Sequence, residues 1–575
     1  MQIVLLAAKT SLCVPLRLVN MSTTVVETIT AELPAHGPPQ TKADPPAQAN
    51  GDTDDWAHGL KSKWPVALDL AGGATPCRLE GEVADLIVHG EIPKEIEGNF
   101  YRVMCDPFVP PDPKNVPIDG DGNVSVFQFH NGRVDMKTKY VETERFKLER
   151  KANKALFGLY RNPYTHHPCV RAAVDSTANT NLMLWAGHLL AMKEVALPYG
   201  VDPVTLETRC YDPFKSQIKS KTFTAHPKYD PITDELVVFG YEAKGLGTTD
   251  VVTYTIDRSG KCKNELWSHQ PYEKPGFIHD MAMTLNWIIL FLWPFEADIA
   301  RMKKGGHHWA WDYNRGATFM VIPRDAANPK AAGWKPNEVR SYDWENCMAI
   351  HTAGAWEDSA GNIYVESSRV HDNAFPFFPP DEENPRMPSP DSKADFVRWK
   401  FDPTQPDRSK IPDPEVMLDC PAEFPRIDER FMTSQYDYVW MNVFVPQKSD
   451  GTKNIYQGLN GLAQHSNKTG KTQFFYAGDN SLIQEPIFIP RSEDAEEGDG
   501  WVMALIERVK ANRCDVVVLD TKNFEKPIAL VQLPLHMKAQ VHGNWVSAKD
   551  LGGYKPIIKP VPDFRISGMG ALEPM

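Results

Sequence analysis

The stretch ELVVFGYEAKGLGTTDVVTYTI, residues 235–256, decides the expected fold. Two short runs rich in valine, tyrosine and threonine flank a glycine-containing segment, which is the pattern of two β-strands joined by a turn. The pattern recurs along most of the chain, at spacings of about 8 to 15 residues. Further runs of this kind are VSVFQF, NLMLWA, ATFMVI, NIYVES, FVRWKF, YVWMNV, TQFFYA, WVMALI and DVVVLD. We therefore expect an all-β protein.

The number of these runs favours one architecture. Roughly 25 runs are too many for one sandwich and come close to the number that seven four-stranded blades require. The sequence therefore predicts a seven-bladed β-propeller, with covering loops and short helices on one face, formed by residues 56–575 as a single catalytic domain. Residues 371–393 and 491–500, rich in proline or acid, are predicted to be loops on its faces. The first is long enough to cover something.

The first 55 residues differ in composition from the rest. Residues 36–55 combine proline, small polar residues and acid, so we expect residues 1–55 to be a disordered leader. A short apolar run at the start is interrupted by Lys9, which favours a cytoplasmic protein but leaves secretion open. The longest apolar run, residues 285–295, is shorter than the ~20 residues that span a bilayer. It is expected to be a buried strand, so no stable membrane span is predicted.

Charge and cysteine content exclude other classes. The net charge of -13 and the absence of a lysine and arginine block argue against a nucleic-acid partner. The nine cysteines contain no C-x-x-C pair, which indicates reduced thiols instead of a disulfide scaffold or a zinc ribbon. A monomer and a weak dimer both remain open.

Histidine is the main source of chemistry, because the common serine-hydrolase, Walker, zinc-protease and dinucleotide motifs are missing. Four single histidines stand in strand-like contexts far apart in the chain: His226, His279, His351 and His542. In a propeller, the inner strand of every blade delivers side chains to one central axis. Widely spaced histidines therefore suit an axial site for Fe, Zn, Cu or Ni. The adjacent pairs at 166–167 and 307–308 suit one metal less well, because neighbours on a strand point to opposite faces.

Several motifs, in this order, resemble the landmarks of the carotenoid cleavage oxygenases. They are GEIPKEIEGNFYRV (90–103), IDGDGNVSVFQFHNGRV (118–134), TANTN (177–181), FTAHPKY (223–229), GFIHDMAMT (276–284), EFPRIDER (423–430), EPIFIPR (485–491) and VHGNWV (541–546). The resemblance extends from about residue 85 to the end of the chain.

This resemblance implies a seven-bladed propeller that holds one Fe(II) on four histidines, with dioxygen as co-substrate. The implied ligands are His226, His279, His351 and His542, and the implied glutamates outside them are Glu194, Glu423 and Glu485. A carboxylate that accepts the far N–H of an imidazole fixes its tautomer and raises its basicity. Pro227 is expected to help end the strand of His226. Many relatives have a second histidine beside the third ligand, which this chain lacks, so His371 competes with His351 for that place.

Three segments resemble the lignostilbene- and resveratrol-cleaving branch of this family: LFGLYRNPY (156–164), TANTN and LLAMKEV (189–195). The resemblance implies that Tyr160 and Lys193 hold the 4-hydroxyl of the substrate. Lys193 directly precedes Glu194, so strand alternation would turn the two side chains to opposite faces unless the strand bulges.

The implied function is cleavage of the α,β double bond of 4-hydroxyphenyl compounds by an iron(II) dioxygenase. Stilbenes such as resveratrol and piceatannol come first, followed by phenylpropenes such as isoeugenol, 4-vinylguaiacol and coniferyl alcohol, with aromatic aldehydes such as vanillin as products. A cationic lysine and a phenol on one oxygen stabilise a phenolate, which makes the conjugated double bond electron-rich. Apocarotenoid cleavage is the alternative among enzymes, and a metal-free propeller that serves as a binding platform is the alternative from another class.

Overall fold

The computed structural model describes Trp64 and residues 75–381, 393–448 and 459–560. The expected leader at residues 1–55 lies outside this part of the chain, as does the middle of the loop predicted at 371–393. Within the described ranges, no helix is long and apolar enough to cross a membrane. The apolar run at 285–295 forms strand β15 (Trp287–Trp293), every residue of which is buried, as expected.

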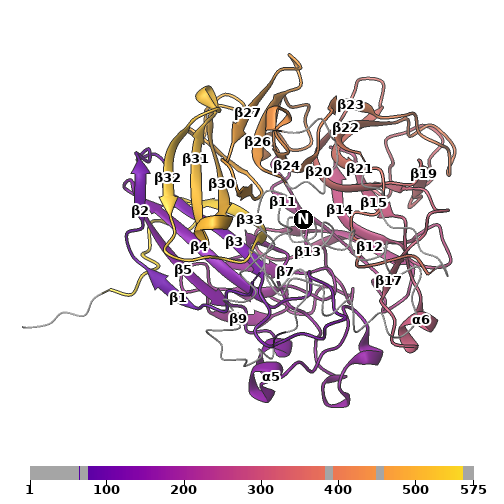
Figure 1. Cartoon of the computed structure of the whole chain (residues 1–575). Helices are drawn as coiled ribbons and strands as arrows, with labels where there is room; N and C mark the ends of the chain where they lie inside the picture. The colour runs from indigo at the N-terminus through magenta and orange to yellow at the C-terminus, as the bar shows by residue number, and fades with distance from the viewer. Residues whose placement is uncertain (1–63, 65–74, 382–392, 449–458, 561–575) are drawn as a thin grey trace, which may run out of the picture.

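Seven antiparallel sheets stand around one axis, which confirms the predicted propeller (Figure 1). Five of them follow one another along the chain. The first two contain β6 (Asn181–Trp185), β7 (His188–Met192), β8 (Tyr199–Val201) and β9 (Thr208–Tyr211), then β10 (Lys228–Asp230), β11 (Glu235–Tyr241), β12 (Asp250–Asp257) and β13 (Cys262–His269). The third contains β14 (Phe277–Met283), β15, β18 (Thr318–Pro323) and β19 (Arg340–Asp343). The last two contain β20 (Met348–Glu357), β21 (Ile363–Val370), β22 (Ala394–Phe401) and β23 (Glu415–Leu418), then β24 (Ala422–Arg426), β25 (Tyr438–Val443), β26 (Gly461–Ser466) and β27 (Thr472–Tyr476).

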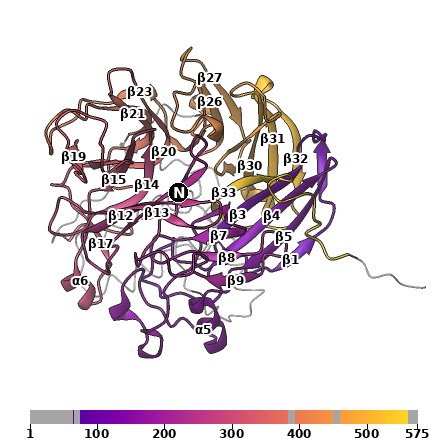
Figure 2. The same cartoon turned by 180° about the vertical axis from the view of Figure 1, so that it is seen from behind.

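The other two blades close the ring, because each joins strands from both ends of the described chain (Figure 2). One contains β2 (Ile87–Gly90), β28 (Ser481–Ile483), β29 (Ile487–Pro490), β30 (Gly500–Arg508), β31 (Arg513–Asp520) and β32 (Pro527–Gln532). The second contains β1 (Gly81–Val83), β3 (Gly98–Cys105), β4 (Gly122–His130), β5 (Arg133–Tyr140) and β33 (Gln540–Ser547). The late strand β33 therefore becomes the inner strand of an otherwise early blade.

The burial pattern of each strand follows its place in a blade. Along β5 buried and accessible residues alternate, as in a strand with one face toward solvent. In β15, by contrast, both faces pack against neighbouring blades. Large aromatic side chains fill the space between blades; Trp287, Trp399, Trp440 and Trp501 are among those that are fully buried. This packing holds the inner strands at fixed positions around the axis.

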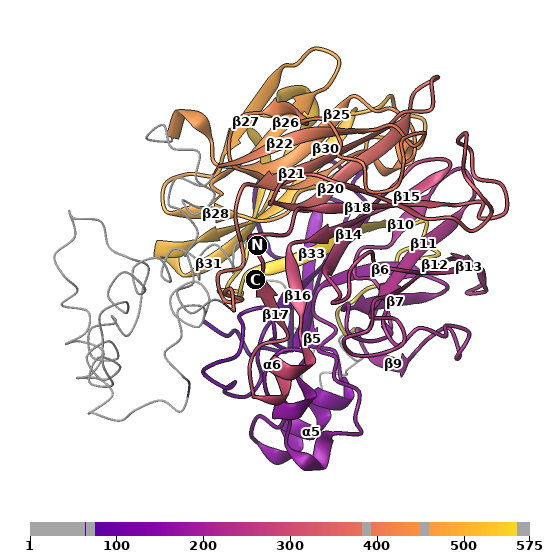
Figure 3. The same cartoon turned by 90° about the vertical axis from the view of Figure 1, so that its right-hand side faces the viewer.

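Helices and one small sheet extend the propeller on one side, as expected. Figure 3 shows α5 (Glu144–Ala152), α6 (Ile299–Lys303) and the ribbon of β16 (Phe295–Ala297) and β17 (Trp309–Trp311) together at one end of the molecule. Both helices begin at a side chain that accepts from the first turn, Thr143 for α5 and Asp298 for α6. Single 3₁₀ turns lie at Pro163–Thr165, Pro168–Val170, Glu429–Phe431, Pro446–Lys448, Val509–Ala511 and Thr521–Asn523.

Candidate active site

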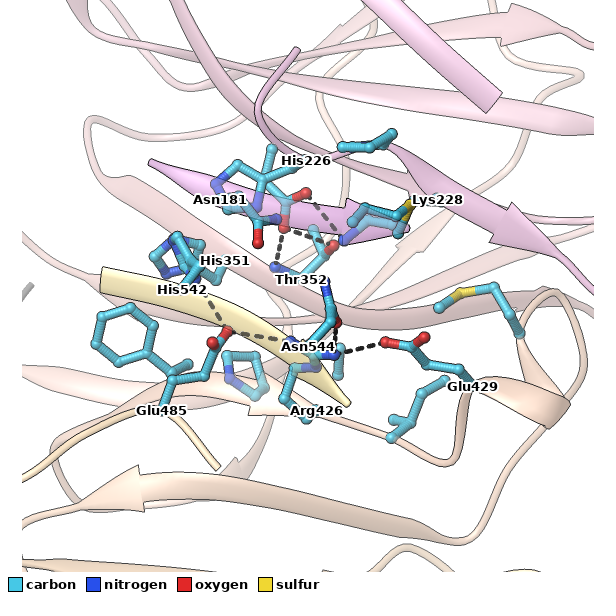
Figure 4. Close-up of a pocket in the computed structure, with 18 residues that line it drawn as sticks. Asn181, His226, Lys228, His351, Thr352, Arg426, Glu429, Glu485, His542 and Asn544 are labelled. Carbon is cyan, nitrogen blue, oxygen red and sulfur yellow. Dashed lines mark hydrogen bonds and ion pairs between the residues drawn. The ribbon is translucent and has the colours of Figure 1, made fainter. Parts of the chain in front are cut away.

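Four histidine rings meet where the inner strands converge, and Figure 4 shows three of them. The Nε2 atom of His279 lies 3.1 Å from Nε2 of His226 and 3.0 Å from Nε2 of His351. With His542 included, one ring nitrogen of each residue lies within 4.8 Å of the others. The structure thus brings together the four histidines that the sequence singles out, from four different blades.

Three glutamates hold three of these rings from outside. The Nδ1 atoms of His279, His351 and His542 lie 2.7, 2.6 and 2.9 Å from carboxylate oxygens of Glu194, Glu423 and Glu485, respectively. An ionised carboxylate only accepts hydrogen bonds, so each Nδ1 carries the ring proton. Among the described residues, His226 has no such carboxylate partner.

The strands that carry these residues are irregular at the functional positions. The pairing register shifts between Ile278 and Met281 in β14 and between Ala349 and Thr352 in β20. It also shifts in β24 just after Glu423 and between β3 and β33 beside His542. An extra residue in one strand bends it and re-aims the next side chain. The irregularities therefore let inner strands turn imidazoles toward one point.

The ring chemistry fits a metal ion. With the proton on Nδ1, the Nε2 atom of His279, His351 and His542 presents a lone pair to the centre. Burial and the neighbouring imidazoles hold the pKa of His226 and of His542 well below the usual value, so both rings are neutral. The Nε2 atom of His542 is buried and has no hydrogen-bond partner in the described chain. Lone pairs that converge in this way repel one another unless a cation lies between them, and neutral imidazoles are good ligands of a divalent transition metal.

An apolar cavity lies on one side of the four histidines and touches His279, His351 and His542. Its walls include Ile118, Phe277, Ile350, Phe375 and Val541. Phe375 comes from the part of the predicted loop at 371–393 that the structure describes, so this loop does cover a cavity, as its length suggested.

Tyr160, Lys193 and Thr180 line this cavity beside the histidines and the glutamate of His279. The Lys193 ammonium lies 4.9 Å from the centre of the Tyr160 ring. It donates to the carbonyl oxygen of Ile118 at 2.9 Å and to Oδ1 of Asn179 at 3.1 Å. An ammonium has three hydrogens, so these two bonds leave one hydrogen without an acceptor in the described structure, while the carboxylate of Asp119, 3.8 Å away, balances the charge. Burial raises the pKa of Tyr160 well above its usual value, so its hydroxyl stays protonated.

Strand alternation does not turn the side chains of Lys193 and Glu194 to opposite faces, because the strand ends before them. Strand β7 ends at Met192, so neither residue belongs to it and strand alternation does not apply. Both side chains reach the same cavity.

A polar cavity lies on the other side and touches His226, His351 and His542 (Figure 4). Its charged groups pair with one another. The Lys228 ammonium lies 2.9 Å from Asp280, and the Arg426 guanidinium lies 2.6 Å from Glu429. Arg426 also donates to Oδ1 of Asn544 at 2.7 Å. The two cavities share two histidines, but His279 touches only the apolar one and His226 only the polar one.

One sequence expectation needs correction, and the competing candidate His371 is excluded. His226 does not lie in a strand that Pro227 ends: β10 begins at Lys228, after the proline. Proline has no N–H to donate to a ladder, so it precedes the strand here. His371 lies outside the cluster, with its side chain 36% exposed and 3.8 Å from Asp395.

The adjacent histidine pairs lie outside the cluster, as expected. His166 contacts Asp175 at 3.1 Å, and His308 contacts Glu242 at the same distance. The sequence analysis missed the aromatic walls Phe277 and Phe375 and the lysine partner Asn179. Phe277 lies two residues before His279 on β14, and Asn179 lies within TANTN, so the motifs contained both residues without stating their roles.

Comparisons with known proteins agree with this geometry. The family model described as RPE65, retinal pigment epithelial membrane protein, matches residues 74–547. The chain is 64% identical to resveratrol cleavage oxygenase 1 of Botryotinia fuckeliana strain B05.10 over 555 residues, which cover 96% of this chain and 98% of that protein. It is 37% identical to isoeugenol monooxygenase of Pseudomonas nitroreducens over 482 residues, with 83% and 97% covered.

A solved structure matches as well. The crystal structure of Pseudomonas brassicacearum lignostilbene dioxygenase is similar with a TM-score of 0.77 and 36% sequence identity. The match covers 85% of this chain and 100% of that one. The similarity therefore extends over the whole propeller and not over a single motif.

Proposed function

The chain belongs to the RPE65/carotenoid oxygenase family, and from this premise we propose that it is an iron(II) dioxygenase which cleaves the α,β double bond of 4-hydroxyphenyl substrates. Stilbenes such as resveratrol and piceatannol come first, because the relative with 64% identity is named for resveratrol cleavage. Phenylpropenes such as isoeugenol, 4-vinylguaiacol and coniferyl alcohol come second, because another relative is an isoeugenol monooxygenase. The products are aromatic aldehydes, with vanillin expected from isoeugenol.

One observation carries the proposal. A cation with a spare hydrogen and a protonated tyrosine stand side by side in an apolar cavity that touches three of the four histidines. The terminal oxygen of an apocarotenoid can accept a hydrogen bond, but it is not a phenol whose negative charge these two groups could stabilise. A phenol oxygen, by contrast, accepts from both, and the apolar walls contact the rest of a flat aromatic substrate. The arrangement therefore favours a phenolic alkene over an apocarotenoid.

We assign the iron to the four histidines His226, His279, His351 and His542, with Glu194, Glu423 and Glu485 as the groups that orient three of them. When bound, iron(II) supplies the redox chemistry that makes dioxygen reactive toward an alkene. The glutamates keep the ring protons on Nδ1, so the Nε2 lone pairs stay available to the metal.

The protein side chains prepare the substrate. The Tyr160 hydroxyl and the Lys193 ammonium donate to the 4-oxygen and stabilise negative charge on it. That charge is conjugated through the ring into the double bond, which becomes electron-rich. Phe277, Ile350 and Phe375 exclude water from the bond that breaks. The double bond and the O–O bond break, each alkene carbon takes one oxygen atom, and the reaction needs no further reductant.

The test is product analysis with purified, iron-loaded protein. Resveratrol, piceatannol, isoeugenol, 4-vinylguaiacol, coniferyl alcohol and one apocarotenoid are supplied separately, and the carbonyl products are identified. We expect aldehydes from the phenols and at most traces from the apocarotenoid. Faster cleavage of the apocarotenoid would overturn the substrate class, and a protein that neither retains iron nor forms products would be a binding platform.

A further inference from the structure

The proposed partner of the substrate oxygen, Tyr160, lies on a segment without regular structure, between α5 and the 3₁₀ turn at Pro163–Thr165. Its hydroxyl makes no hydrogen bond within the described chain. Its backbone N–H donates to Oδ1 of Asn115 at 3.0 Å. The depth at which the phenol enters the cavity therefore depends on the contacts that fix this segment.

The next residue, Arg161, fixes the segment to blade strand β11. Its Nη1 donates to the hydroxyl of Tyr241, the last residue of β11, at 2.6 Å, and its Nη2 forms an ion pair with Glu242. The guanidinium also lies over the Tyr241 ring, 5.0 Å from its centre. The backbone of Arg161 has φ 53°, a left-handed conformation that non-glycine residues adopt only when their surroundings enforce it.

His308, which directly precedes β17, contacts both Arg161 and Glu242. Its Nδ1–H donates to the carbonyl oxygen of Arg161 at 3.0 Å, and its Nε2 lies 3.1 Å from the carboxylate of Glu242. The side chain is fully buried. His308 thus contacts both the backbone and the ion-pair partner of the residue that follows Tyr160. A buried ion pair that is also hydrogen-bonded rarely adds much to the free energy of unfolding, but it can impose one conformation.

We propose that Arg161, Glu242 and His308 are positioning residues that hold the Tyr160 hydroxyl at the substrate oxygen. The inference rests on the proposed role of Tyr160. None of the three lines the apolar cavity, so they act through Tyr160 and not on the substrate. Lys193 is held separately, by Ile118 and Asn179. Loss of the contacts between Arg161, Glu242 and His308 therefore displaces Tyr160 from the phenol oxygen and leaves Lys193 in place.

The chain offers a matched control in the same dipeptide. His307 is the neighbour of His308, but its Nδ1 has no hydrogen-bond partner in the described chain, and its ring packs near Phe378, at 5.8 Å between ring centres. We expect His308→Ala to lower kcat/KM for resveratrol about 10- to 100-fold, since a displacement of about 1 Å at a reacting geometry costs up to about 100-fold. His307→Ala should change it less than about 2-fold.

A double-mutant cycle separates positioning from general damage. Each histidine variant is made in the parent chain and in the Tyr160→Phe chain, and iron content and thermal unfolding are measured alongside kcat/KM. If His308 acts through the Tyr160 hydroxyl, His308→Ala costs less than about 3-fold once that hydroxyl is gone. An equal loss in both backgrounds would overturn the inference. A Tyr160→Phe chain with parental kcat/KM would instead contradict the proposed role of Tyr160 itself.

Tyr241→Phe serves as a milder variant in case His308→Ala does not fold. It removes one oxygen atom, the acceptor of the Arg161 hydrogen bond, and keeps the ring. We expect a loss of about 3- to 10-fold in kcat/KM for resveratrol that vanishes in the Tyr160→Phe background. A Tyr241→Phe chain that folds and matches the parent would count against the inference.

Discussion

The two cavities on either side of the histidines differ in how their polar groups are used. On the apolar side, Lys193 retains an unused hydrogen among aromatic and aliphatic walls. On the polar side, Lys228 pairs with Asp280 and Arg426 with Glu429. The Lys193 charge is also balanced, by Asp119 at 3.8 Å, but that contact is too long for a hydrogen bond, so its third N–H stays without an acceptor until a ligand provides one. This difference is the reason why we propose the apolar cavity as the substrate site.

The largest expected effect concerns the proposed iron and should not distinguish the two cavities, because histidines that line each of them are proposed ligands. Replacement of His226, on the polar side, or His279, on the apolar side, by alanine should abolish turnover and reduce bound iron from about one per chain to background. His351→Ala and His542→Ala should do the same. Metal analysis of the purified variants checks this.

The control for this experiment is His371→Ala, because His371 lies outside the cluster and should leave the iron content unchanged. Stoichiometric iron in a His226→Ala His542→Ala double variant would falsify the ligand assignment.

The next largest effect concerns the apolar side alone. A methyl ether at the 4-position cannot donate or ionise and places a methyl group against Lys193 and Tyr160. A site built to bond a hydroxyl rejects such an analogue by about 10⁴-fold. We expect 4-O-methylated resveratrol and methylisoeugenol to be nearly inert in oxygen-uptake assays. Lys193→Ala should slow the phenols and leave the ethers unchanged; comparable kcat/KM for phenol and ether in the parent would refute the phenolate mechanism.

A smaller effect is expected from the glutamates that orient the histidines, and it should be similar for each of them. Glu194 orients the histidine of the apolar cavity, and Glu485 orients one that both cavities share. Glutamine keeps the shape but loses the charge that strengthens Nδ1–H donation, so each substitution should lower iron affinity or activity about 10- to 100-fold. Glu423→Gln should behave alike. Parental iron binding and turnover in all three variants would show that these glutamates do not tune the site.

The smallest effect is expected from a substitution in the polar cavity, and it tests whether substrate binds there. Glu429 is 41% exposed in its side chain and pairs with Arg426 at the edge of the polar cavity. If substrate binds only on the apolar side, Glu429→Gln should change kcat/KM for resveratrol less than about 2-fold, because the Glu429 carboxylate is partly in solvent and Arg426 keeps its bonds to Asn544 and Glu485. A substitution in the wall of the apolar cavity, Phe375→Ala, should lower kcat/KM for resveratrol clearly more. The reverse ranking would move substrate to the polar cavity.

The residues differ in how well the sequence predicted their surroundings. His351 and His371 compete on sequence grounds, and the bulge in β20 and the position of Glu423 favour His351 in space. The loop at 371–393 is predicted to cover something, and Phe375 shows what it covers. Arg161, Glu242 and His308 could not be connected from the sequence, because they come from three separate segments that meet only after the blades pack.

The sequence alone determined the strand pattern, the propeller and the identities of the four histidines and three glutamates. Strand periodicity is local, and the family motifs lie within short continuous segments. The tertiary structure decided which side chains share a cavity, how the bulges aim the imidazoles, and that His226 precedes its strand. It also decided that Lys193 and Glu194 face the same space. These features depend on where β7 and its neighbours end and on how distant blades close around one axis, and no local pattern encodes such long-range packing.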